Sequence, residues 1–591
     1  MYRLFLMLLF ATVSLIATAQ SRIRVNQMGY LVNDKKVAVM VMLEEQAVNT
    51  FEVINIDTRR SVKLKTVKNI GASSPFKATA RLDFSEITTP GTYIIKVGDV
   101  ESLRFRIGND VYAGSQEIPL YYMRQNRCGY NPFLKDSCHT HDGIIVLHPT
   151  RSGEKIDVVG GWHDASDYLQ YVTTSANATY EMMFAYLGAP EVWRDDYNSA
   201  GDKGGNGVPD ILDEARWGLE WLVKMNPDST TFFNQIADDR DHRLAVLPQN
   251  DLVDYGWGEG NGRPVYPCSG TPYGLYKNKN DSKGLASSVG KFASCFALGA
   301  DIFEKIDPEF ASLLRGKAGN AYAVAAANPG ACQTAPCVSP YYYEEDNWAD
   351  DMALAAMQMF RSTGERHYLA DAVDYGRLEP VNPWMGADSA HHYQWYPFIN
   401  LGHYYLAVQN DKRVRAEFVR NMRSGLQRVA ERADGNPFLN GIPFIWCSNN
   451  LTVAFVTQAM LYREITGDDT YLEIETAMRD WLFGVNPWGK CMIIGLPADG
   501  DYPTDPHSAL SNLNNYPITG GLVDGPVYTN IFRSLRGVTL RNADRYAPFQ
   551  GDNVVYHDDY SDYSTNEPTM DGTASTTIML SRLARKALKL K

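Results

Sequence analysis

Short apolar runs separated by turn residues fill the chain from residue 22 to about residue 108. Pairs such as Asn33-Asp34 and Pro90-Gly91 interrupt the pattern at positions that favour turns. The runs are Ile23–Val25, Val37–Met42, Phe51–Ile56, Val62–Val67, Ala78–Phe84, Thr92–Val97 and Leu103–Ile107. Strands of this length and spacing predict a small β-sandwich over residues 21–108.

After Gly108 the pattern changes to helical spacing. One stripe behind Pro209, at a first-turn position, comprises Ile211, Leu212, Ala215, Leu219 and Leu222. Further helices are expected near residues 286–306, 310–328, 347–363, 415–433, 448–466, 471–483 and 573–589. Long loops rich in Gly, Pro, Tyr and Trp join them, and no strands alternate with the helices. Residues 109–591 are therefore predicted to form a helical toroid whose loops build a cleft at one end.

The first twenty residues differ from both regions. A basic start, Met1-Tyr2-Arg3, precedes an apolar run from Leu4 to Ile16 and the small-residue end Ala17-Thr18-Ala19-Gln20. This pattern predicts a cleaved secretory signal peptide over residues 1–20, because the apolar run is too short for a comfortable membrane span. No cysteine lies near the cleavage region, so a lipid anchor is not expected. The expected location is secreted or periplasmic.

Composition narrows the class of partner. The chain of 591 residues is 45% hydrophobic and 21% charged, as in a folded soluble protein. Its net charge of -13 argues against nucleic acid or an anionic membrane as a partner. Neutral glycans are not steered by charge, so they remain compatible.

Two carboxylates lie three residues apart in Gly160-Gly161-Trp162-His163-Asp164-Ala165-Ser166-Asp167. In a helix or turn, this spacing projects Asp164 and Asp167 to one side. Close acidic groups repel, so hydrogen bonds to one of them favour keeping both ionised, which suits a general base and a partner on the same water. The two glycines allow the backbone to approach a ligand closely. An alternative is a helix N-terminus capped by Asp164, with Asp167 in the first turn.

A third carboxylate, Glu567, lies in Asn566-Glu567-Pro568-Thr569-Met570-Asp571, before the last helical run. The stretch from His557 to Tyr563 upstream is dense in acids and tyrosines. Such neighbours can hold a carboxyl group protonated, as a general acid requires. The alternative is an acidic flank of the final helix.

Five segments in a fixed order carry a resemblance. They are Ile23–Tyr30, Gly160–Asp167, Asp210–Gly218, Phe483–Gly489 and Asn566-Glu567. Together they resemble glycoside hydrolase family 9, an inverting cellulase family with an (α/α)6 barrel, and the first segment resembles the opening of the immunoglobulin-like domain found in one subgroup. The resemblance implies a mainly α protein, with an (α/α)6-barrel catalytic domain over residues 109–591 behind an immunoglobulin-like β-sandwich.

The resemblance also implies the catalytic roles. Asp167 is the expected general base, Asp164 its partner on the nucleophilic water, and Glu567 the general acid. Inversion needs room for that water, so the carboxyl groups of Asp167 and Glu567 are predicted to lie about 6.5–9.5 Å apart. The expected activity is endo-acting hydrolysis of a β-1,4-glucan by a monomer. An exo-acting β-glucosidase or glucosaminidase on the same scaffold and a non-catalytic glycan-binding protein are the alternatives.

The sequence departs from the family at two places, of which the second concerns the substrate. Ser166 replaces a glycine between the aspartates, which adds a Cβ and a hydroxyl beside the base. In Asp505-Pro506-His507-Ser508-Ala509 the family commonly has Pro-His-His-Arg, so only the first histidine is retained. His507 is expected to contact sugar, although a loop histidine is the plainer interpretation. The substitutions favour a decorated glucan such as xyloglucan, or exo action.

Aromatic side chains provide further candidate sugar contacts. Tyr168 follows the aspartate pair, and Trp446 lies in one of the long loops. Aromatic rings suit the apolar face of a sugar, although a single tryptophan is more often a core residue. Both residues are predicted to bind substrate.

Cysteine and histidine residues suggest a metal site. Cys128, Cys138, His139 and His163 supply the two thiolates and two imidazoles of a structural zinc site, and some relatives bind zinc with a similar set. A Cys128–Cys138 disulfide is the alternative. Cys332 and Cys337 in a Pro-rich loop are a second possible disulfide pair.

Calcium is the other expected cation. Asp350 and Asp351 match a region that supplies oxygen ligands to calcium in some family members. The alternative for these two residues is a solvated acidic first turn of a helix.

Overall fold

Two antiparallel β-sheets pack face to face over residues 22–107 of the computed structural model, which describes residues 21–242 and 246–589. The predicted signal peptide lies outside the described residues. One sheet has the order β1 (Arg22–Arg24), β2 (Val37–Met42), β6 (Ala78–Asp83), β5 (Val67–Asn69). The other contains β4 (Ser61–Leu64), β3 (Phe51–Asn55), β7 (Gly91–Val97) and β8 (Val100–Glu101), with β9 (Phe105–Ile107) also on β7. The predicted β-sandwich is confirmed.

Strand β2 is buried on both faces, and its two faces belong to different cores. Ala38, Met40 and Met42 pack inside the sandwich. Val39 and Val41 alternate with them and join the core of the helical part of the chain. The two-residue period of a strand therefore attaches the sandwich to the helices through one of its own sheets.

Six helices form a closed ring. Each contacts the next, and the last contacts the first. In ring order they are α2 (Val172–Gly188), α4 (Ala286–Phe303), α6 (Ala349–Thr363), α8 (Leu401–Ala407), α10 (Ser448–Thr466) and α14 (Met570–Lys589). Each ring helix also packs against an outer helix; the outer set is α3 (Asp210–Met225), α5 (Pro308–Ala327), α7 (Arg366–Leu378), α9 (Lys412–Ala433), α11 (Leu472–Trp481) and α1 (Ile118–Gln125). This arrangement confirms the (α/α)6 barrel.

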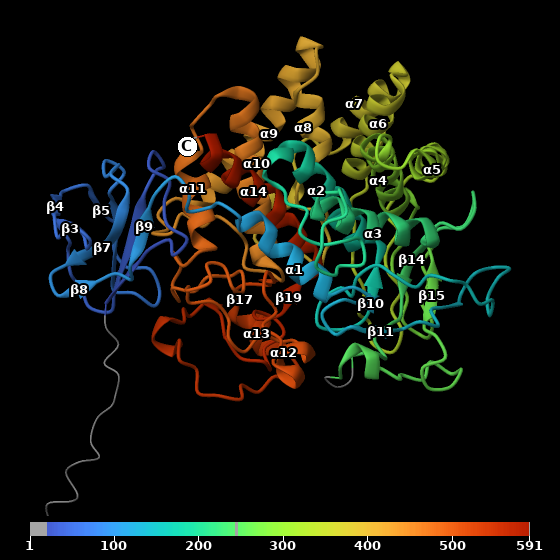
Figure 1. Cartoon of the computed structure of the whole chain (residues 1–591), viewed down its shortest axis with the longest axis horizontal. Coiled ribbons are helices and arrows are strands. Elements are labelled where there is room, and N and C mark those ends of the chain that lie inside the picture. Colours follow the sequence, from blue (N-terminus) through green and yellow to red (C-terminus); the bar gives the residue numbers. More distant parts are fainter. Residues whose placement is uncertain (1–20, 243–245, 590–591) are drawn as a thin grey trace, which may run out of the picture.

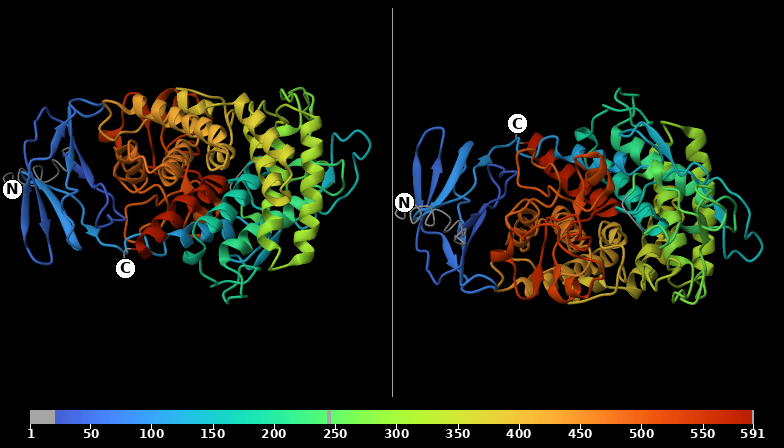
Figure 2. Two further views of the ribbon diagram at one scale, coloured as in Figure 1. Left: turned by 90° about the horizontal axis from the view of Figure 1, so that it is seen from above. Right: turned by 90° about the horizontal axis from the view of Figure 1, so that it is seen from below.

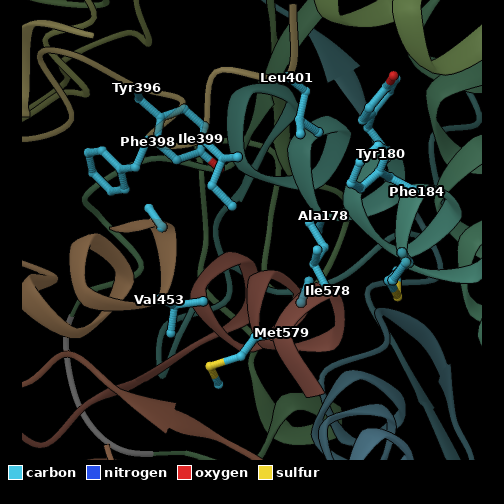
Figure 3. Close-up of a cluster of buried hydrophobic side chains, with 14 of the residues drawn as sticks. Ala178, Tyr180, Phe184, Tyr396, Phe398, Ile399, Leu401, Val453, Ile578 and Met579 are labelled. Carbon is cyan, nitrogen blue, oxygen red and sulfur yellow. The ribbon is translucent and has the colours of Figure 1, made fainter. Parts of the chain in front are cut away.

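The inner helices meet in an extended apolar core, part of which is drawn in Figure 3. It brings together Tyr180 and Phe184 of α2, Val453 of α10, and Ile578 and Met579 of α14. The outer helix α9 is buried on one face only, through Phe418, Met422, Gly425, Leu426, Val429 and Ala433. No helix in the described part of the chain is both long and apolar enough to cross a membrane.

Long loops and short strands gather at one end of the barrel (Figure 1). Strand β13 (Gln170–Tyr171) leads into α2, and β19 (Pro568–Thr569) leads into α14. Since α2 and α14 are neighbours in the ring, the two loops that precede them are brought to the same place. These loops contain Asp164 to Asp167 and Glu567.

The β-sandwich lies beside the helical body, at one end of the long axis of the molecule (Figures 1 and 2). A buried polar network joins the two parts. Asp34 of the sandwich accepts a hydrogen bond of 2.8 Å from Arg479 of α11 and another from Lys586 of α14. Asn26 donates a hydrogen bond of 2.7 Å to Asp480, which also pairs with Arg479 at 2.7 Å.

Candidate active site

The two carboxylate-bearing loops touch directly. The Met570 backbone N–H, at the start of α14, donates a hydrogen bond of 3.0 Å to the carbonyl of Asp164. Oε1 of Glu567 accepts a hydrogen bond of 3.1 Å from the Ser166 backbone N–H and a second from the Ser166 hydroxyl. Asp164, Asp167 and Glu567 therefore belong to one site, although 400 residues separate them along the chain. The predicted gap of about 6.5–9.5 Å between the base and the acid stays a prediction.

The segment from Asp164 to Asp167 is a series of bends, not the helix N-terminus considered from the sequence. Helix α2 begins only at Val172, so the capping interpretation of Asp164 is wrong. The glycine interpretation also needs correction. A Cβ at Gly161, whose φ is +69°, would lie 2.7 Å from the ring of Trp221. Gly161 thus permits close packing against a tryptophan of α3, not against a ligand.

Asp164 is buried and held by two hydroxyl groups. Thr174 of α2 donates a hydrogen bond of 2.5 Å to Oδ1, and Tyr343 donates another to Oδ2. Burial raises the pKa of Asp164 well above its usual range, the charge of Asp167 raises it further, and the two hydroxyl donors oppose this rise. Burial and the neighbouring charge of Asp167 therefore both favour the protonated form of Asp164.

Asp167 is more accessible than Asp164 and has a basic partner. Oδ2 of Asp167 lies 2.8 Å from Nε2 of His242, while Oδ1 accepts a hydrogen bond of 3.0 Å from the Leu169 backbone N–H. Burial lowers the pKa of His242, but the charge and hydrogen bond of Asp167, together with the charges of Asp241 and Glu567, outweigh burial and raise the pKa to about 9. At neutral pH an imidazolium therefore faces the carboxylate of Asp167.

Glu567 faces into the site and not along the flank of the last helix. Its backbone carbonyl accepts a hydrogen bond of 2.8 Å from the Asp524 N–H. Burial raises the pKa of the Glu567 carboxyl; His507 opposes this rise, and the charge of Asp167 adds to it. The site thus contains a buried carboxyl group whose pKa is raised, in the loop next to the one that carries Asp167.

A continuous series of ring contacts, here called the aromatic arc, borders these carboxylates. It consists of Tyr341, Tyr343, His392, Trp446, Tyr563, His507 and Tyr560, whose successive ring centroids lie 6.2, 4.9, 5.8, 6.0, 6.0 and 5.0 Å apart. One end lies beside the partner of Asp167, because the Tyr341 ring centroid is 5.7 Å from that of His242. The sequence candidates His507 and Trp446 both belong to the arc. Rings of this kind suit stacking against sugars.

His507 is fixed at the acid side of the site. Its backbone N–H donates a hydrogen bond of 3.0 Å to the carbonyl of Asn566, the residue before Glu567. Ser508 and Ala509, where the family commonly has His and Arg, are buried at the start of the short helix α12 (Ala509–Asn514). The nearby cation is instead Arg541, whose guanidinium lies 3.8 Å from the centroid of the Tyr560 ring.

Tyr168 has a different place from the one predicted. It is 7% exposed, its hydroxyl donates to the carbonyl of Val246, and its ring packs 4.7 Å from the ring of His163 and 5.6 Å from that of His139. These contacts assign Tyr168 to the wall of the cysteine–histidine cluster and not to the aromatic arc.

The four predicted metal ligands do come together. One ligand atom from each of Cys128, Cys138, His139 and His163 lies within 4.8 Å of all the others. Cys128 Sγ is 3.6 Å from His139 Nδ1, and Cys138 Sγ is 3.8 Å from His163 Nε2. A tetrahedral site with bonds of about 2.0–2.3 Å separates its ligand atoms by roughly 3.3–3.8 Å. The cluster therefore has a composition and spacing that fit a metal ion.

Contacts behind the cluster support the same conclusion. His139 turns its other nitrogen, Nε2, to the carboxylate of Asp251 at 3.0 Å. A carboxylate in this position fixes the tautomer that leaves Nδ1 for a metal. His163 directly precedes Asp164, so the cluster holds one end of the catalytic loop.

None of the eight cysteines, all of which lie within the described residues, forms a disulfide bond. The Cys332–Cys337 prediction and the Cys128–Cys138 alternative are therefore wrong. The Cys332 thiol faces the side chain of Asn234 at 3.5 Å, whereas Cys337 faces Asp238 and Asp239. Although only four residues separate the two cysteines, their thiols have different neighbours.

Asp350 and Asp351 form the first turn of α6, but both are buried, so the solvated alternative is wrong. Lys291 of α4 pairs with Asp351 at 2.7 Å and with Glu345 at 2.5 Å. The lysine ammonium thus occupies the position of a cation at Asp351. Asp350 lies beside Glu379. Burial and the charge of Asp350 together raise the pKa of Glu379 to about 10.

The sequence did not identify His242 and Tyr343 as site residues. His242 lies 75 positions after Asp167, and Tyr343 lies 179 positions after Asp164. Their only local signals are an acidic run before His242 and the triple tyrosine Tyr341-Tyr342-Tyr343. Neither signal points to an aspartate in another loop.

Family comparisons cover most of the chain. The family described as "Glycosyl hydrolase family 9" matches residues 112–580. The "Cellulase N-terminal ig-like domain" matches residues 18–102. The two matches follow the division between the sandwich and the helical barrel.

Similar curated proteins and solved structures agree with these matches. Endoglucanase D of Acetivibrio thermocellus is 24% identical over 529 residues, covering 85% of this chain and 78% of its own. The xyloglucan-specific endo-beta-1,4-glucanase BoGH9A of Bacteroides ovatus is 24% identical over 542 residues, covering 85% of each chain. The crystal structure of a metagenome-derived glycoside hydrolase family 9 endoglucanase has a TM-score of 0.73 at 26% identity, over 95% of this chain and 99% of that chain. A Zn-binding triple mutant of the family 9 endoglucanase J30 has a TM-score of 0.73 at 25% identity, over 94% and 99%.

Proposed function

The chain belongs to glycosyl hydrolase family 9, and we propose that it is an inverting endo-β-1,4-glucanase with Asp167 as general base and Glu567 as general acid. The observation that supports this proposal is the pair of hydrogen bonds from Ser166 to Glu567, which join the Glu567 carboxyl group to the loop that carries Asp167. The relatives named endoglucanase support the same activity.

The proposed reaction uses the two carboxyl groups from opposite sides of the scissile bond. Glu567 donates its proton to the glycosidic oxygen as the bond to the leaving sugar breaks. Asp167 accepts a proton from a water that attacks the anomeric carbon from the other face, and the configuration inverts. Asp164, held by Thr174 and Tyr343, positions the same water.

The charge distribution supports this assignment over the reverse one. Glu567 is buried and its pKa is raised, so it holds a proton to donate. Asp167 faces the imidazolium of His242, which favours a charged carboxylate at that position. His242 is accordingly proposed to stabilise the base in its reactive form.

The aromatic arc supports a polymeric substrate. Its rings extend from His242, beside Asp167, to His507 and Tyr560 on the side of Glu567, and those that are not buried offer stacking surfaces to successive sugars. We expect purified enzyme to lower the viscosity of a soluble cellulose derivative, mixed-linkage glucan or xyloglucan well before reducing ends accumulate. Parallel viscometry and reducing-end assays on the three glucans test this prediction and identify the preferred backbone.

The alternatives give different results in these assays. An exo-acting glucosidase or glucosaminidase releases monomer with little loss of viscosity. A non-catalytic glycan-binding protein retains the polymer without cleaving it. A decorated substrate is favoured if xyloglucan is cut faster than the undecorated glucans; the Bacteroides ovatus relative is named as xyloglucan-specific.

Zinc is the proposed occupant of the cysteine–histidine cluster, with Cys128, Cys138, His139 and His163 as ligands. Four protein ligands close the coordination sphere, so the ion would be structural. A relative of similar fold has a zinc-binding variant. When bound, the ion would fix His163 and thereby the loop that carries Asp164 and Asp167.

We expect elemental analysis to find one zinc per chain and a strong chelator to lower the melting temperature by at least about 5 °C. Cys138→Ser should lose the zinc and show the lower melting temperature without chelator. Cys268→Ser, at a cysteine outside the cluster, is the matched control and should keep the metal. A protein that contains no zinc and whose melting temperature does not change with chelator would contradict the proposal.

Calcium is proposed at Asp350 and Glu379, and no longer at Asp351, which Lys291 neutralises. Two buried carboxyl groups in contact repel when both are charged, and a divalent cation would relieve this repulsion. The same elemental analysis counts calcium; its absence from protein purified in calcium-containing buffer would remove this proposal.

A further inference from the structure

Ser166 is the one residue of the catalytic loop that departs from the family sequence and also touches the proposed acid. Its backbone N–H donates a hydrogen bond of 3.1 Å to Oε1 of Glu567, a bond that glycine would also provide. Its hydroxyl donates a second hydrogen bond to the same oxygen, and glycine has no group to replace it. The substitution therefore adds one donor to the acid.

We propose that the Ser166 hydroxyl is a positioning group that orients the Glu567 carboxyl and tunes its acidity for proton donation. This inference rests on the proposed function, because it assumes that Glu567 is the general acid. The Glu567 backbone is held separately by Asp524. The side-chain orientation, in contrast, depends on what its carboxyl oxygens bind.

The geometry separates the functions of the two carboxyl oxygens. An oxygen that accepts two hydrogen bonds is a poor position for the acidic proton, since both donors already point at its lone pairs. In the protonated acid, Oε1 is then the carbonyl oxygen and Oε2 carries the proton. The proton leaves Oε2 for the glycosidic oxygen, and both donors stabilise the carboxylate that remains.

The Ser166 hydroxyl also acts against the burial of Glu567, which raises the pKa of this carboxyl group. Burial raises the pKa of Glu567, His507 and Asp167 act in opposite directions, and the Ser166 hydrogen bonds lower it. Other titratable groups that interact with Glu567 are Asp524, His242, Tyr122, Tyr341, Tyr560 and Tyr563. All of these groups are unchanged when only the hydroxyl of Ser166 is removed.

The direction of the expected pH effect follows from which form of Glu567 the Ser166 hydroxyl stabilises. A hydroxyl that donates to a carboxylate stabilises the charged form, so its loss raises the pKa of Glu567. Activity requires the protonated acid and is lost as pH rises through this pKa. Ser166→Ala should therefore move the alkaline limb of the kcat/KM profile upward by about one pH unit.

Three variants test the proposal on a soluble β-glucan. Ser166→Ala and Ser166→Gly remove the hydroxyl and keep the backbone N–H, whereas Ser166→Thr keeps both. We expect Ala and Gly to shift the alkaline limb upward and to lower kcat about 5- to 10-fold with KM nearly unchanged. Ser166→Thr should keep the alkaline limb of the pH profile at its wild-type position. Ser166→Gly restores the family residue and so provides a second variant should alanine fail to fold.

Activity on a substrate with a good leaving group distinguishes a loss of Glu567 positioning from general damage to the site. Dinitrophenyl cellobioside needs little proton donation, so the Ala and Gly variants should cleave it at the wild-type rate. If both variants keep the wild-type pH limb and kcat on the polymer, or lose activity equally on both substrates, the inference is overturned. If Glu567→Gln itself retains polymer hydrolysis, the proposed function fails instead, which is a distinct result.

Discussion

Glu567→Gln is expected to lower kcat on a β-1,4-glucan by about 10³–10⁴-fold while changing substrate binding little. Glutamine has nearly the shape of the acid but no proton of comparable acidity to give to the leaving oxygen. Its side-chain oxygen still accepts the hydrogen bonds that Ser166 donates to Oε1. Steady-state kinetics and isothermal titration with an oligosaccharide measure the two quantities.

A pair of variants distinguishes the acid from the base. On dinitrophenyl cellobioside, Glu567→Gln should recover most of its activity, because this leaving group needs no proton. Asp167→Asn should remain inactive on both substrates, because the water still needs a base. Glu309→Gln, at an exposed position in the first turn of α5, is the matched control and should behave as wild type. Equal recovery of the Asp167 and Glu567 variants would contradict the assigned roles.

Arg479→Met is expected to destabilise the protein by about 3–5 kcal/mol. Arg479 is 3% exposed and pairs with both Asp34 of the sandwich and Asp480 of α11. Methionine preserves much of the volume but leaves two buried carboxyl groups without their shared cation. Burial already raises the pKa of Asp480 to about 6 with the arginine present. Chemical unfolding followed by tryptophan fluorescence measures the loss.

An exposed ion pair of the sandwich supplies the control. Lys96 and Glu101 pair at 3.1 Å, with side chains 38% and 49% exposed. Lys96→Met should change the free energy of unfolding by less than about 1 kcal/mol, because solvent screens such pairs. Equal small losses for both lysine and arginine variants would mean that the network between the two domains contributes little to stability.

The sequence allowed the prediction of helices whose apolar positions form one stripe. Outer helices such as α3 and α9 have a polar face, so their period is visible. Helix α2, which is buried almost all round and shows little contrast between its faces, was not predicted. Burial alone does not explain this miss, because the equally buried inner helices α4 and α10 were predicted and the amphipathic outer helix α7 was not.

The residues of the site also divide into those that the sequence could identify and those that it could not. Asp164, Asp167 and Glu567 could be proposed from short motifs, because each motif lies within a few residues. His242 and Tyr343 complete their environment from loops whose approach depends on the closed ring. The same limit explains Tyr168, which the chain places beside Asp167 but the fold turns toward His163.

The closing helix of the ring has a consequence for the order of synthesis. Helix α14 completes the ring against α2, follows directly after Glu567, and carries Lys586, which reaches Asp34 across 552 positions of sequence. Contacts between the two ends of a chain form late and make folding slow. A ribosome-bound chain that still lacks this helix cannot close the ring and lacks the contact of Lys586 with Asp34 between the two domains. We therefore expect the closed ring, and with it the complete site, to form only after α14 has been synthesised.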